Sequence, residues 1–560
     1  MNILGISCYY HDSAAALIMD GKVVAAAQEE RFNRKKSSAE FPLLATNYVL
    51  QEGGISILEI DAIIFYENPF QKFARVMLNH LKAYPFSLPN FMRTTPVWLD
   101  NRLIMPLVFK KELGYTGKVY YTRHHNSHAA SAFFLSSFEE SAFMTADGIG
   151  EFSSVSAGMG TDKNLEPLFQ INYTDSLGLF YTAISTFLGF RALTGEGKVM
   201  GLASYGNPRF TEDLREIIEI RDDGSFRIDT SYFGFNKGHR MFNRKFIRKF
   251  GTPRVPESEI TPRDMDLAAS LQKITEEILI NTANHLYGLT KSPHLSLAGG
   301  VFLNCVANGK IVKETPFQKI FVQPAAGDSG GALGAAAAGY TFLSGKRTLP
   351  LQNVYLGPSY TNRKIEQVLS INNLEYKKYT DQELVDHAAK LLSKGMIAGW
   401  FHGRMEFGPR ALGHRSILAS PADPKMKDRI NKKVKRREIF RPYAPSVLKE
   451  HSEDYFDLGT ESPFMLFAGE VRKDMRDKIP AVTHVDNSAR IHTVEKDISP
   501  RYYALIEAFH KTTGIPVLLN TSFNVRGQPI VNTPQEAIDC FLNTDMDFLV
   551  LENFIIEKHK

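Results

Sequence analysis

The sequence predicts an α/β protein of two domains, in which the first domain contains one structural unit twice. Residues 2–28 and residues 142–171 show the same order of three apolar strands separated by polar turns. The stretch 345–357 has no clear helical or strand period, and further α/β sequence follows it. A length of 560 residues also exceeds that of one ordinary domain.

The first copy of the unit begins with the apolar segment "NILGIS" at 2–7. The polar turn "CYYHDS" leads to a second apolar segment at 14–19, and Asp20-Gly21 leads to a third at 22–28. An Asp-Gly pair between two apolar segments strongly favours a β-hairpin. Residues 142–171 repeat this order, so we expect a duplicated α/β fold.

A long amphipathic helix is predicted over 264–288, since Leu267, Leu271, Ile274 and Ile278 recur at helical spacing and Gly288 ends the pattern. Residues 294–311 then read as strand, Gly-Gly turn and helix. Residues 320–340 read as strand, glycine-rich turn and a helix of small residues, which suits close packing. The polar, basic stretch 235–262 is interpreted as an inserted loop region.

Net charge, cysteine spacing and apolar segments indicate which partners and which cellular compartment to expect. The net charge of +5 suits phosphate-bearing ligands without requiring nucleic acid. Cys8, Cys305 and Cys540 lie far apart and form no CxxC, which is typical of a reducing cytoplasm. The N-terminus lacks the basic region of a signal peptide, and no run of 18 apolar residues occurs. We therefore expect a cytoplasmic protein with neither a membrane nor a nucleic acid as partner.

The segment "TRHHNSHAAS" at 122–131 contains His124, His125 and His128 at the start of a predicted helix. Positions i and i+4 share a helix face, so His124 and His128 could bind one metal ion while His125 points away. Capping or core hydrogen bonding is the alternative, because about 0.5 H-x-x-x-H pairs are expected by chance in a chain of this composition, so the motif alone is a weak signal. The pair therefore needs further ligands.

Asp147 and Asp328 each end a predicted strand, where a carboxylate rarely stays uncompensated. Taken singly, each aspartate is better explained as a turn-forming residue than as a metal ligand. Together with the two histidines they form a mixed nitrogen and oxygen ligand set, which suits Fe(II), Mn(II) or Zn(II) better than calcium. The sequence thus predicts a metal site.

Three glycine-containing turns, at 146–154, 297–304 and 325–335, follow predicted strands. Backbone amides in such turns can hold phosphates, and glycine lets the phosphate approach. Three of them in one duplicated domain fit the ATP site of actin, hexokinases and sugar kinases. A sugar kinase would, however, need a catalytic aspartate and Mg²⁺ rather than a histidine pair, and would leave the second domain unexplained.

The second domain is rich in groups that hold a dianion. These groups are Arg404, Arg410, Arg415, Lys432, Lys433, Lys435, Arg436, Arg437, Arg441 and Arg490, with Asn520, Thr521, Ser522, Asn524 and Arg526 as further donors. Most charges of "KKVKRRE" are expected to face solvent, whereas Lys435 and Arg441 adjoin apolar sequence. RNA binding is the competing interpretation, but few aromatic residues are interleaved here.

These motifs together resemble the O-carbamoyltransferases of antibiotic and nodulation-factor biosynthesis, such as the tobramycin and cephamycin enzymes. The matching motifs occur in order along nearly the whole chain: "GISCYYHDSAA", "EERFNRKK", "HHNSHAASAF", "ADGIGEFSS", "GEGKVMGLASYG", "LAGGVFLNCVAN", "PAAGDSGGALGAA", "FGPRALGHRSIL", "FRPYAPSV" and "LNTSFNVRGQP".

The resemblance implies two domains and two chemical steps. Residues 1–346 would form a duplicated actin-like (ASKHA) domain, akin to the protein that transfers threonylcarbamoyl to tRNA. Residues 352–560 would form a YrdC-like α/β domain with a twisted sheet, in which carbamoyl phosphate and ATP give carbamoyladenylate. The actin-like domain would then transfer the carbamoyl group to a hydroxylated small molecule, releasing AMP. A threonylcarbamoyl-type factor that modifies tRNA and a sugar kinase are the alternatives.

The resemblance also assigns residues to roles. The metal ligands would be His124, His128, Asp147 and Asp328, with iron as the expected ion and ATP entering with Mg²⁺. His11 would be the general base, as a neutral imidazole near pH 7. The nucleotide would contact Lys36 (or its neighbour Lys35), Asp147, Gly148, Ile149, Gly150, Glu151, Gly299, Gly300 and Asn304. Carbamoyl phosphate would contact Arg410, Lys435, Arg441, Arg490, Asn520 and Ser522.

The acceptor is not identified by the sequence. Its pocket is expected near 189–201 and the loops 66–105 and 235–262. A homo-oligomer is compatible with the sequence.

Overall fold

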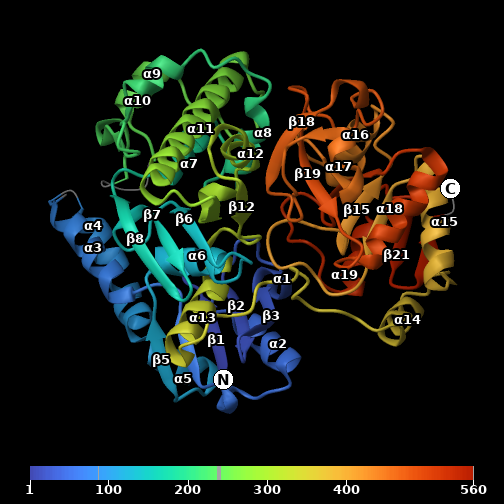
Figure 1. The fold of residues 1–560 in the computed structure, drawn as a ribbon, viewed down its shortest axis with the longest axis horizontal. Coiled ribbons are helices and arrows are strands. Elements are labelled where there is room, and N and C mark those ends of the chain that lie inside the picture. The colour runs from blue at the N-terminus through green and yellow to red at the C-terminus, as the bar shows by residue number, and fades with distance from the viewer. Residues whose placement is uncertain (83, 86, 236–240, 559–560) are drawn as a thin grey trace. The chain divides into compact units, whose positions relative to one another are not determined.

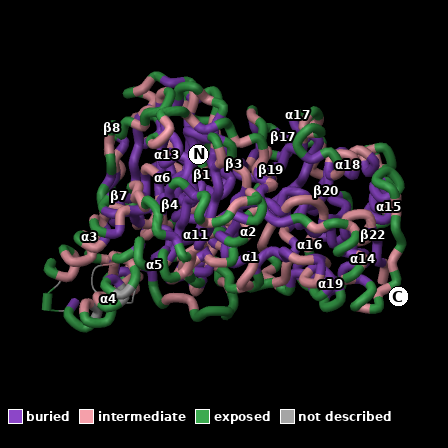
Figure 2. The backbone as a smooth tube through the Cα atoms, turned by 90° about the horizontal axis from the view of Figure 1, so that it is seen from below, coloured by how far each residue is buried: buried purple, intermediate pink, exposed green. Residues whose placement is uncertain are grey.

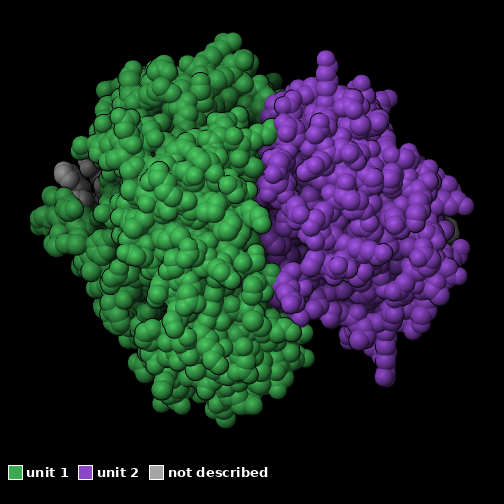
Figure 3. All heavy atoms as spheres, viewed as in Figure 1, with its two compact units in different colours: residues 1–29, 37–351 green, residues 30–36, 352–560 purple. Residues whose placement is uncertain are grey.

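The computed structural model describes residues 1–82, 84–85, 87–235 and 241–558 (Figure 1). They form two compact units, one of residues 1–29 and 37–351 and the other of residues 30–36 and 352–560 (Figure 3). The chain thus divides after Leu351, within the irregular stretch 345–357. Residues 30–36 differ from expectation, because they pack with the second unit rather than the first.

The first sheet of the first unit has the strand order β3-β2-β1-β4-β5. Its strands are β1 (Asn2–Ser7), β2 (Ala14–Met19), β3 (Lys22–Gln28), β4 (Ala62–Phe65) and β5 (Lys118–Tyr121). Strands β1, β2 and β3 form an antiparallel meander, and β4 and β5 continue parallel to β1. The Asp20-Gly21 hairpin is confirmed, with positive φ angles of 48° and 84°.

The second sheet repeats this topology in the order β8-β7-β6-β11-β12. Its strands are β6 (Glu140–Ala146), β7 (Ser153–Thr161), β8 (Asn164–Asn172), β11 (His294–Ala298) and β12 (Lys319–Val322). Again the first three strands form an antiparallel meander, and the last two run parallel to β6. The predicted duplication is confirmed by this identical strand order.

Helices accompany both sheets of the first unit. They are α2 (Leu43–Gly53), α3 (Pro69–Lys82), α4 (Leu88–Asp100), α5 (Met105–Leu113), α6 (His124–Phe133), α7 (Leu177–Phe187), α8 (Glu196–Ala203), α9 (Thr211–Arg215), α10 (Arg244–Phe250), α11 (Pro262–Thr290), α12 (Cys305–Glu314) and α13 (Asp328–Ser344). A small hairpin is formed by β9 (Ile218–Ile220) and β10 (Phe226–Ile228). The helix predicted over 264–288 is α11, capped by the Thr261 hydroxyl.

Close packing around α13 explains its small residues. A Cβ atom on Gly334 would lie 1.8 Å from the carbonyl oxygen of Ser127 in α6, and one on Gly5 would lie 1.9 Å from that of Ala332. The backbone of α13 therefore packs directly on the backbone of β1 and on that of α6. Figure 2 shows this region as buried, with α6, α13, β1 and β4 in its core.

Two stretches expected as loops contain helices. Residues 66–105 form α3 and α4, and residues 235–262 include α10. Residues 83, 86 and 236–240 of these stretches lie outside the described residues. Helix α3 is amphipathic, with Phe70, Phe73, Met77 and Leu81 at helical spacing, so its period was present in the sequence and the expectation of a loop was wrong there. In α4, Pro96 lies inside the helix, and a proline there argues against a helix in a prediction from sequence.

The second unit is an α/β unit built on one ten-stranded sheet, with the order β13-β22-β21-β14-β15-β20-β16-β19-β18-β17. The strands are β13 (Lys377–Lys378), β14 (Ala398–Phe401), β15 (Arg415–Ala419), β16 (Ala444–Leu448), β17 (Phe456–Asp457), β18 (Phe467–Val471), β19 (Ser488–Val494), β20 (Val517–Ser522), β21 (Phe548–Leu551) and β22 (Phe554–Glu557). The helices are α1 (Glu30–Asn33), α14 (Asn362–Ile371), α15 (Asp381–Ser393), α16 (Met426–Arg429), α17 (Ser452–Tyr455), α18 (Pro500–Thr513) and α19 (Pro534–Leu542). Helices α15 and α18 cover the core around Trp400 and Phe509.

Two arginines fix residues 30–36 in the second unit. Arg31 Nη2 donates to the carbonyl of Gly408 at 2.8 Å. Arg34 donates to the carbonyls of Ile530 at 2.8 Å and Pro529 at 2.9 Å, and its Nη1 lies 3.1 Å from Glu536 Oε2. Guanidinium groups thus replace the apolar packing that usually fixes so short a segment.

No helix among the described residues has the length and apolarity to cross a bilayer. The three cysteines are free and buried.

Candidate functional site

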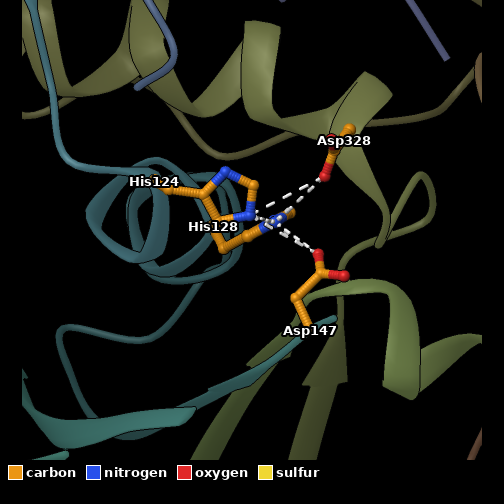
Figure 4. A group of neighbouring side chains, drawn as sticks. All are labelled: His124, His128, Asp147 and Asp328. Carbon is orange, nitrogen blue, oxygen red and sulfur yellow. Dashed lines mark hydrogen bonds and ion pairs between the residues drawn. The ribbon is translucent and has the colours of Figure 1, made fainter. Parts of the chain in front are cut away.

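Helix α6 presents His124 and His128 on one face, as their spacing of four predicts (Figure 4). Their Nε2 atoms lie 3.1 Å apart. Both rings are buried, with 2% and 0% exposure. At this distance one ring can donate its N–H to the other, or both nitrogens can direct their lone pairs at one metal ion.

Asp147 and Asp328 complete the cluster from other elements. Asp147 follows β6, and Asp328 is the first residue of α13. Asp147 Oδ2 lies 3.0 Å from His128 Nε2, and Asp328 Oδ1 lies 3.7 Å from the same nitrogen. One ligand atom from each of the four residues falls within 4.8 Å of all the others. The predicted metal ligands are therefore brought together.

The donor set fits a divalent transition metal. Two ligands at about 2.1 Å from a metal ion are about 3.0 Å apart in octahedral geometry and about 3.4 Å apart in tetrahedral geometry, and the observed spacing of the two Nε2 atoms lies between these values. Neither oxygen of Asp328 accepts a hydrogen bond, although the residue is only 1% exposed. A buried carboxylate of this kind needs a compensating charge. Two nitrogens and two oxygens suit iron, manganese or zinc.

The two carboxylates make the cluster favourable for protonated histidines or for a bound cation. Burial lowers the pKa of His128, but Asp147 and Asp328 outweigh it and raise the pKa to about 9. Burial raises the pKa of Asp147, but His124 and His128 hold it well below its usual range. The two carboxylates thus stay ionised and attract a cation.

His125 points away from the cluster. Its Nδ1 lies 2.8 Å from Thr145 Oγ1 and its Nε2 lies 2.9 Å from the carbonyl oxygen of Ser153. Burial lowers the pKa of His125 to about 3. It is a neutral core histidine, as the helix spacing predicts.

His11 lies at the edge of the cluster. Its Nε2 is 3.7 Å from Asp328 Oδ2, and its Nδ1 is 2.9 Å from Asp12 Oδ2. Burial lowers the pKa of His11, but Asp328, Asp12 and Asp147 together raise it to about 10. The neutral imidazole expected near pH 7 is therefore disfavoured while these carboxylates lack another counter-charge.

The glycine turns surround Asp147. Its Oδ1 accepts from the Gly148 amide at 2.6 Å, and its Oδ2 accepts from the Gly300 amide at 3.2 Å. Gly299 has a φ of 102°, and a Cβ atom there would lie 2.1 Å from the Ala146 carbonyl oxygen. Only glycine allows the turn after β11 to pack so closely on the end of β6.

Other predicted nucleotide residues serve the protein itself. The Glu151 carboxylate accepts the backbone amides of Asn68 at 2.7 Å and His124 at 3.0 Å, so it caps α6. Asn304 caps α12 by accepting the Ala307 amide at 3.1 Å. Ile149 and Gly150 are buried within the same turn as Glu151. These residues therefore hold the turns at which the nucleotide contacts are predicted.

In the second unit, Lys435 is 2% exposed, and its Nζ donates hydrogen bonds to oxygen atoms of the protein itself. It donates to the Ser522 carbonyl at 2.7 Å, the Asn524 carbonyl at 2.8 Å and Asn524 Oδ1 at 2.5 Å. Burial and Arg437 lower its pKa well below the usual value. Lys435 therefore shapes the loop after β20 by holding Ser522 and Asn524.

The remaining predicted phosphate residues lie near that loop. Burial, Arg437 and Arg410 lower the pKa of Arg441 to about 10, although Glu438 opposes them. Asn520 is fully buried, and its side-chain amide donates to Ala411 and Ser446 while its Oδ1 has no partner. Arg490 lies on β19, next to β16. Arginines that lie close enough to repel one another, as Arg441 does with Arg410 and Arg437, favour the binding of an anion between them.

Lys36 belongs to this unit. It is expected at the nucleotide site of the first domain, but it lies within segment 30–36 and is one of the cations that lower the pKa of Lys435. The structure therefore groups Lys36 with the basic residues of the second unit.

One acidic residue near the metal cluster escaped the sequence analysis. Glu67 Oε2 lies 3.9 Å from His124 Nδ1, on the side of the ring away from the cluster, and Lys72 Nζ donates to the same oxygen. Glu67 comes two residues after β4. A carboxylate that soon follows a buried strand is the signal that identified Asp147, and it could have identified Glu67.

Known protein families match most of the chain. The family model described as "Carbamoyltransferase N-terminus" matches residues 2–337, and the model described as "Carbamoyltransferase C-terminus" matches residues 389–558. The nodulation protein NolNO of Sinorhizobium fredii is 40% identical over 565 residues, covering 98% of this chain and 79% of that protein.

An uncharacterised protein of Synechocystis, sll1178, is 45% identical over 594 residues, covering 100% of this chain and 97% of that protein. Among solved structures, HypF of T. kodakarensis is 14% identical and covers 62% of this chain and 48% of that one, with a TM-score of 0.32. A score this low establishes no common fold. The duplicated α/β fold of the first unit is therefore assigned from the identical strand order of its two five-stranded sheets.

Proposed function

The chain belongs to the carbamoyltransferase family, and on that premise we propose that it is an ATP-dependent O-carbamoyltransferase. Its substrates would be carbamoyl phosphate, ATP and a hydroxyl group of a small molecule. The observation that carries the proposal is the convergence of two histidines and two aspartates within 4.8 Å, with His11 at their edge. Such a cluster suits the transfer of a carbamoyl group away from a phosphate.

The first step is assigned to the second unit. Carbamoyl phosphate, ATP and one water would give carbamoyladenylate, phosphate and pyrophosphate. Arg410 and Arg441 lie close enough to influence each other, and Lys435 holds the adjoining loop. A dianion between these cations would relieve their repulsion, which supports this location for carbamoyl phosphate.

The second step is assigned to the first unit. The acceptor oxygen would attack the carbamoyl carbon while the bond from that carbon to the AMP oxygen breaks. His124, His128, Asp147 and Asp328 would hold a divalent metal ion, iron by family resemblance, which supplies positive charge next to the leaving phosphate. His11 would accept the hydroxyl proton, which requires that the charge of Asp147 and Asp328 is balanced by that cation.

Two variants test the assignment of steps. Arg410→Ala should reduce the carbamoyl-phosphate-dependent release of pyrophosphate from ATP by about 100-fold or more, because a charged contact to the reacting dianion is lost. His11→Asn should leave this release unchanged and block only the transfer to a hydroxyl. Pyrophosphate release is measured without any acceptor, so it needs no knowledge of the final product.

Each variant is the control for the other. Loss of pyrophosphate release in both variants would contradict the division of steps between the units. Mass spectrometry of hydroxylated metabolites incubated with enzyme, ATP and carbamoyl phosphate then identifies the acceptor by the gain of one carbamoyl group.

A further inference from the structure

His124 has a second ring nitrogen that the metal cluster does not use. Its Nδ1 is buried and makes no hydrogen bond. Among the described residues, Glu67 is the only acidic side chain within 4.0 Å of Nδ1, with Oε2 at 3.9 Å. A shift of about 1 Å would bring these two atoms into hydrogen-bond range. The carboxylate therefore faces the ring from the side opposite the cluster.

Glu67 is held in an unusual place for a carboxylate. It is 5% exposed and pairs with Lys72 of α3, which is 3% exposed. A buried ion pair is costly to desolvate and contributes little to stability compared with apolar side chains of similar size. Its position directly behind a histidine of the cluster suggests a use other than stability.

We propose that Glu67 is a positioning residue, whose carboxylate accepts the Nδ1–H of His124 and thereby directs the Nε2 lone pair towards the metal ion. Carboxylate partners of this kind fix the tautomer and the orientation of metal-binding imidazoles. The inference rests on the metal site proposed above. Lys72 supplies the counter-charge of the buried Glu67 carboxylate, and its ion pair among the described residues is with Glu67 and not with His124.

Removal of the Glu67 carboxylate should disturb only His124 among the four metal ligands. Among the described residues, no carboxylate lies within 4.0 Å of the Nδ1 atom of His128, whose contacts with Asp147 and Asp328 all involve Nε2. His128 and both aspartates would keep their geometry in a Glu67 variant. Removal of the Glu67 charge should therefore weaken metal binding without abolishing it.

The test compares metal affinities of full-length variants by competition between the protein and a chromophoric chelator, with Co(II) and Zn(II) as probes. Glu67→Gln should weaken binding by about 10–100-fold. The visible absorption spectrum of bound Co(II) should also change, since His124 would coordinate in another orientation. Glu29→Gln is the matched control, because Glu29 is also a buried carboxylate of the first unit but caps α2 instead.

Lys72→Gln separates positioning from a merely structural role. It breaks the same ion pair but leaves the carboxylate facing His124, so metal affinity should stay within a few-fold of wild type. An equal loss of affinity in Lys72→Gln and Glu67→Gln would overturn the proposal. If Glu67→Gln fails to fold, Glu67→Asp takes its place: it retains the charge but withdraws it from Nδ1, so it should bind metal more weakly than both the wild type and Lys72→Gln.

The outcomes distinguish a failure of the proposed metal site from a failure of the proposed role of Glu67. Wild-type protein that binds neither Co(II) nor Zn(II) stoichiometrically would refute the metal site itself. Wild-type protein that binds metal, together with a folded Glu67 variant of equal affinity and identical Co(II) spectrum, would refute only the role of Glu67.

Discussion

Asp147 and Asp328 occupy the same cluster, but the protein supports them differently. Asp147 accepts the backbone amides of Gly148 and Gly300. Asp328 accepts no hydrogen bond at either oxygen. Its charge is therefore compensated only by the neighbouring imidazoles and by whatever cation the cluster binds. The free energy of folding and metal binding should consequently depend on the two aspartates in different ways.

Asp328→Asn should weaken metal binding by at least about 100-fold, because it removes an anionic ligand. It breaks no hydrogen bond, so the variant should unfold in chelator at the wild-type temperature or above. Metal content after dialysis and thermal unfolding in chelator measure the two effects. Asp328→Asn protein that retains stoichiometric metal would contradict the ligand assignment.

At the residue scale, the spacing of the two histidines and the position of Asp147 directly after β6 are local signals, and they predicted these residues. The expectation that Asp328 ends a strand was wrong, because β12 ends at Val322 and Asp328 begins α13. Glu151 and Asn304 were predicted as nucleotide contacts, yet their side chains cap α6 and α12. Which backbone amide a carboxylate or amide side chain accepts depends on tertiary structure. These caps therefore could not be predicted from local sequence, and the nucleotide contacts of the two residues stay a prediction.

Among the elements, α6 and α13 determine the geometry of the cluster. Helix α6 carries His124 and His128, and α13 begins with Asp328. The distance between the two helices therefore sets the distances between three of the four ligands. Gly334 permits their backbones to touch at Ser127.

Gly334→Ala should destabilise the first unit by about 1–3 kcal/mol, because the added Cβ atom would overlap the Ser127 carbonyl oxygen. The helices must separate, so metal affinity should fall as well. Thermal unfolding and chelator competition measure both quantities.

The matched control is Gly288→Ala in α11, where an added Cβ atom meets nothing within 4 Å. Alanine favours helix over glycine, so this change should stabilise the protein by up to about 1 kcal/mol. Equal behaviour of the two variants would show that the contact between α6 and α13 is unimportant.

Elements with strong local patterns were predicted well, as the Asp20-Gly21 hairpin and helix α11 illustrate. Helices α3 and α4 were missed. Phe70 and Leu78 of α3 and Met92 of α4 are exposed, and Pro96 interrupts α4. The amphipathic period of α3 could have been recognised from its sequence, whereas a proline inside α4 argues against a helix there.

For the whole molecule, the path of the chain is the feature that the sequence did not reveal. The chain leaves the first unit after residue 29, contributes residues 30–36 to the second unit, and returns. The motif "EERFNRKK" looks like a solvated helix end, because its partners Gly408, Pro529 and Ile530 lie hundreds of residues away.

Arg34→Ala should therefore destabilise the second unit, by about 1–3 kcal/mol, because its hydrogen bonds to Pro529 and Ile530 and its ion pair with Glu536 are lost. Hydrogen exchange should become faster in α19 and remain unchanged in α13. Arg221→Ala, which removes an exposed ion pair with Glu219, is the control and should alter neither helix. Faster exchange confined to the first unit would contradict the chain path.

The placement of Arg34 also has a consequence for biosynthesis. The ribosome adds Arg34 about 500 residues before Glu536. At about 5–20 residues per second, this arginine waits about 25–100 s for its partners to emerge. Residues 30–36 therefore leave the ribosome long before the rest of the second unit, and a much later part of the chain completes the structure to which they belong.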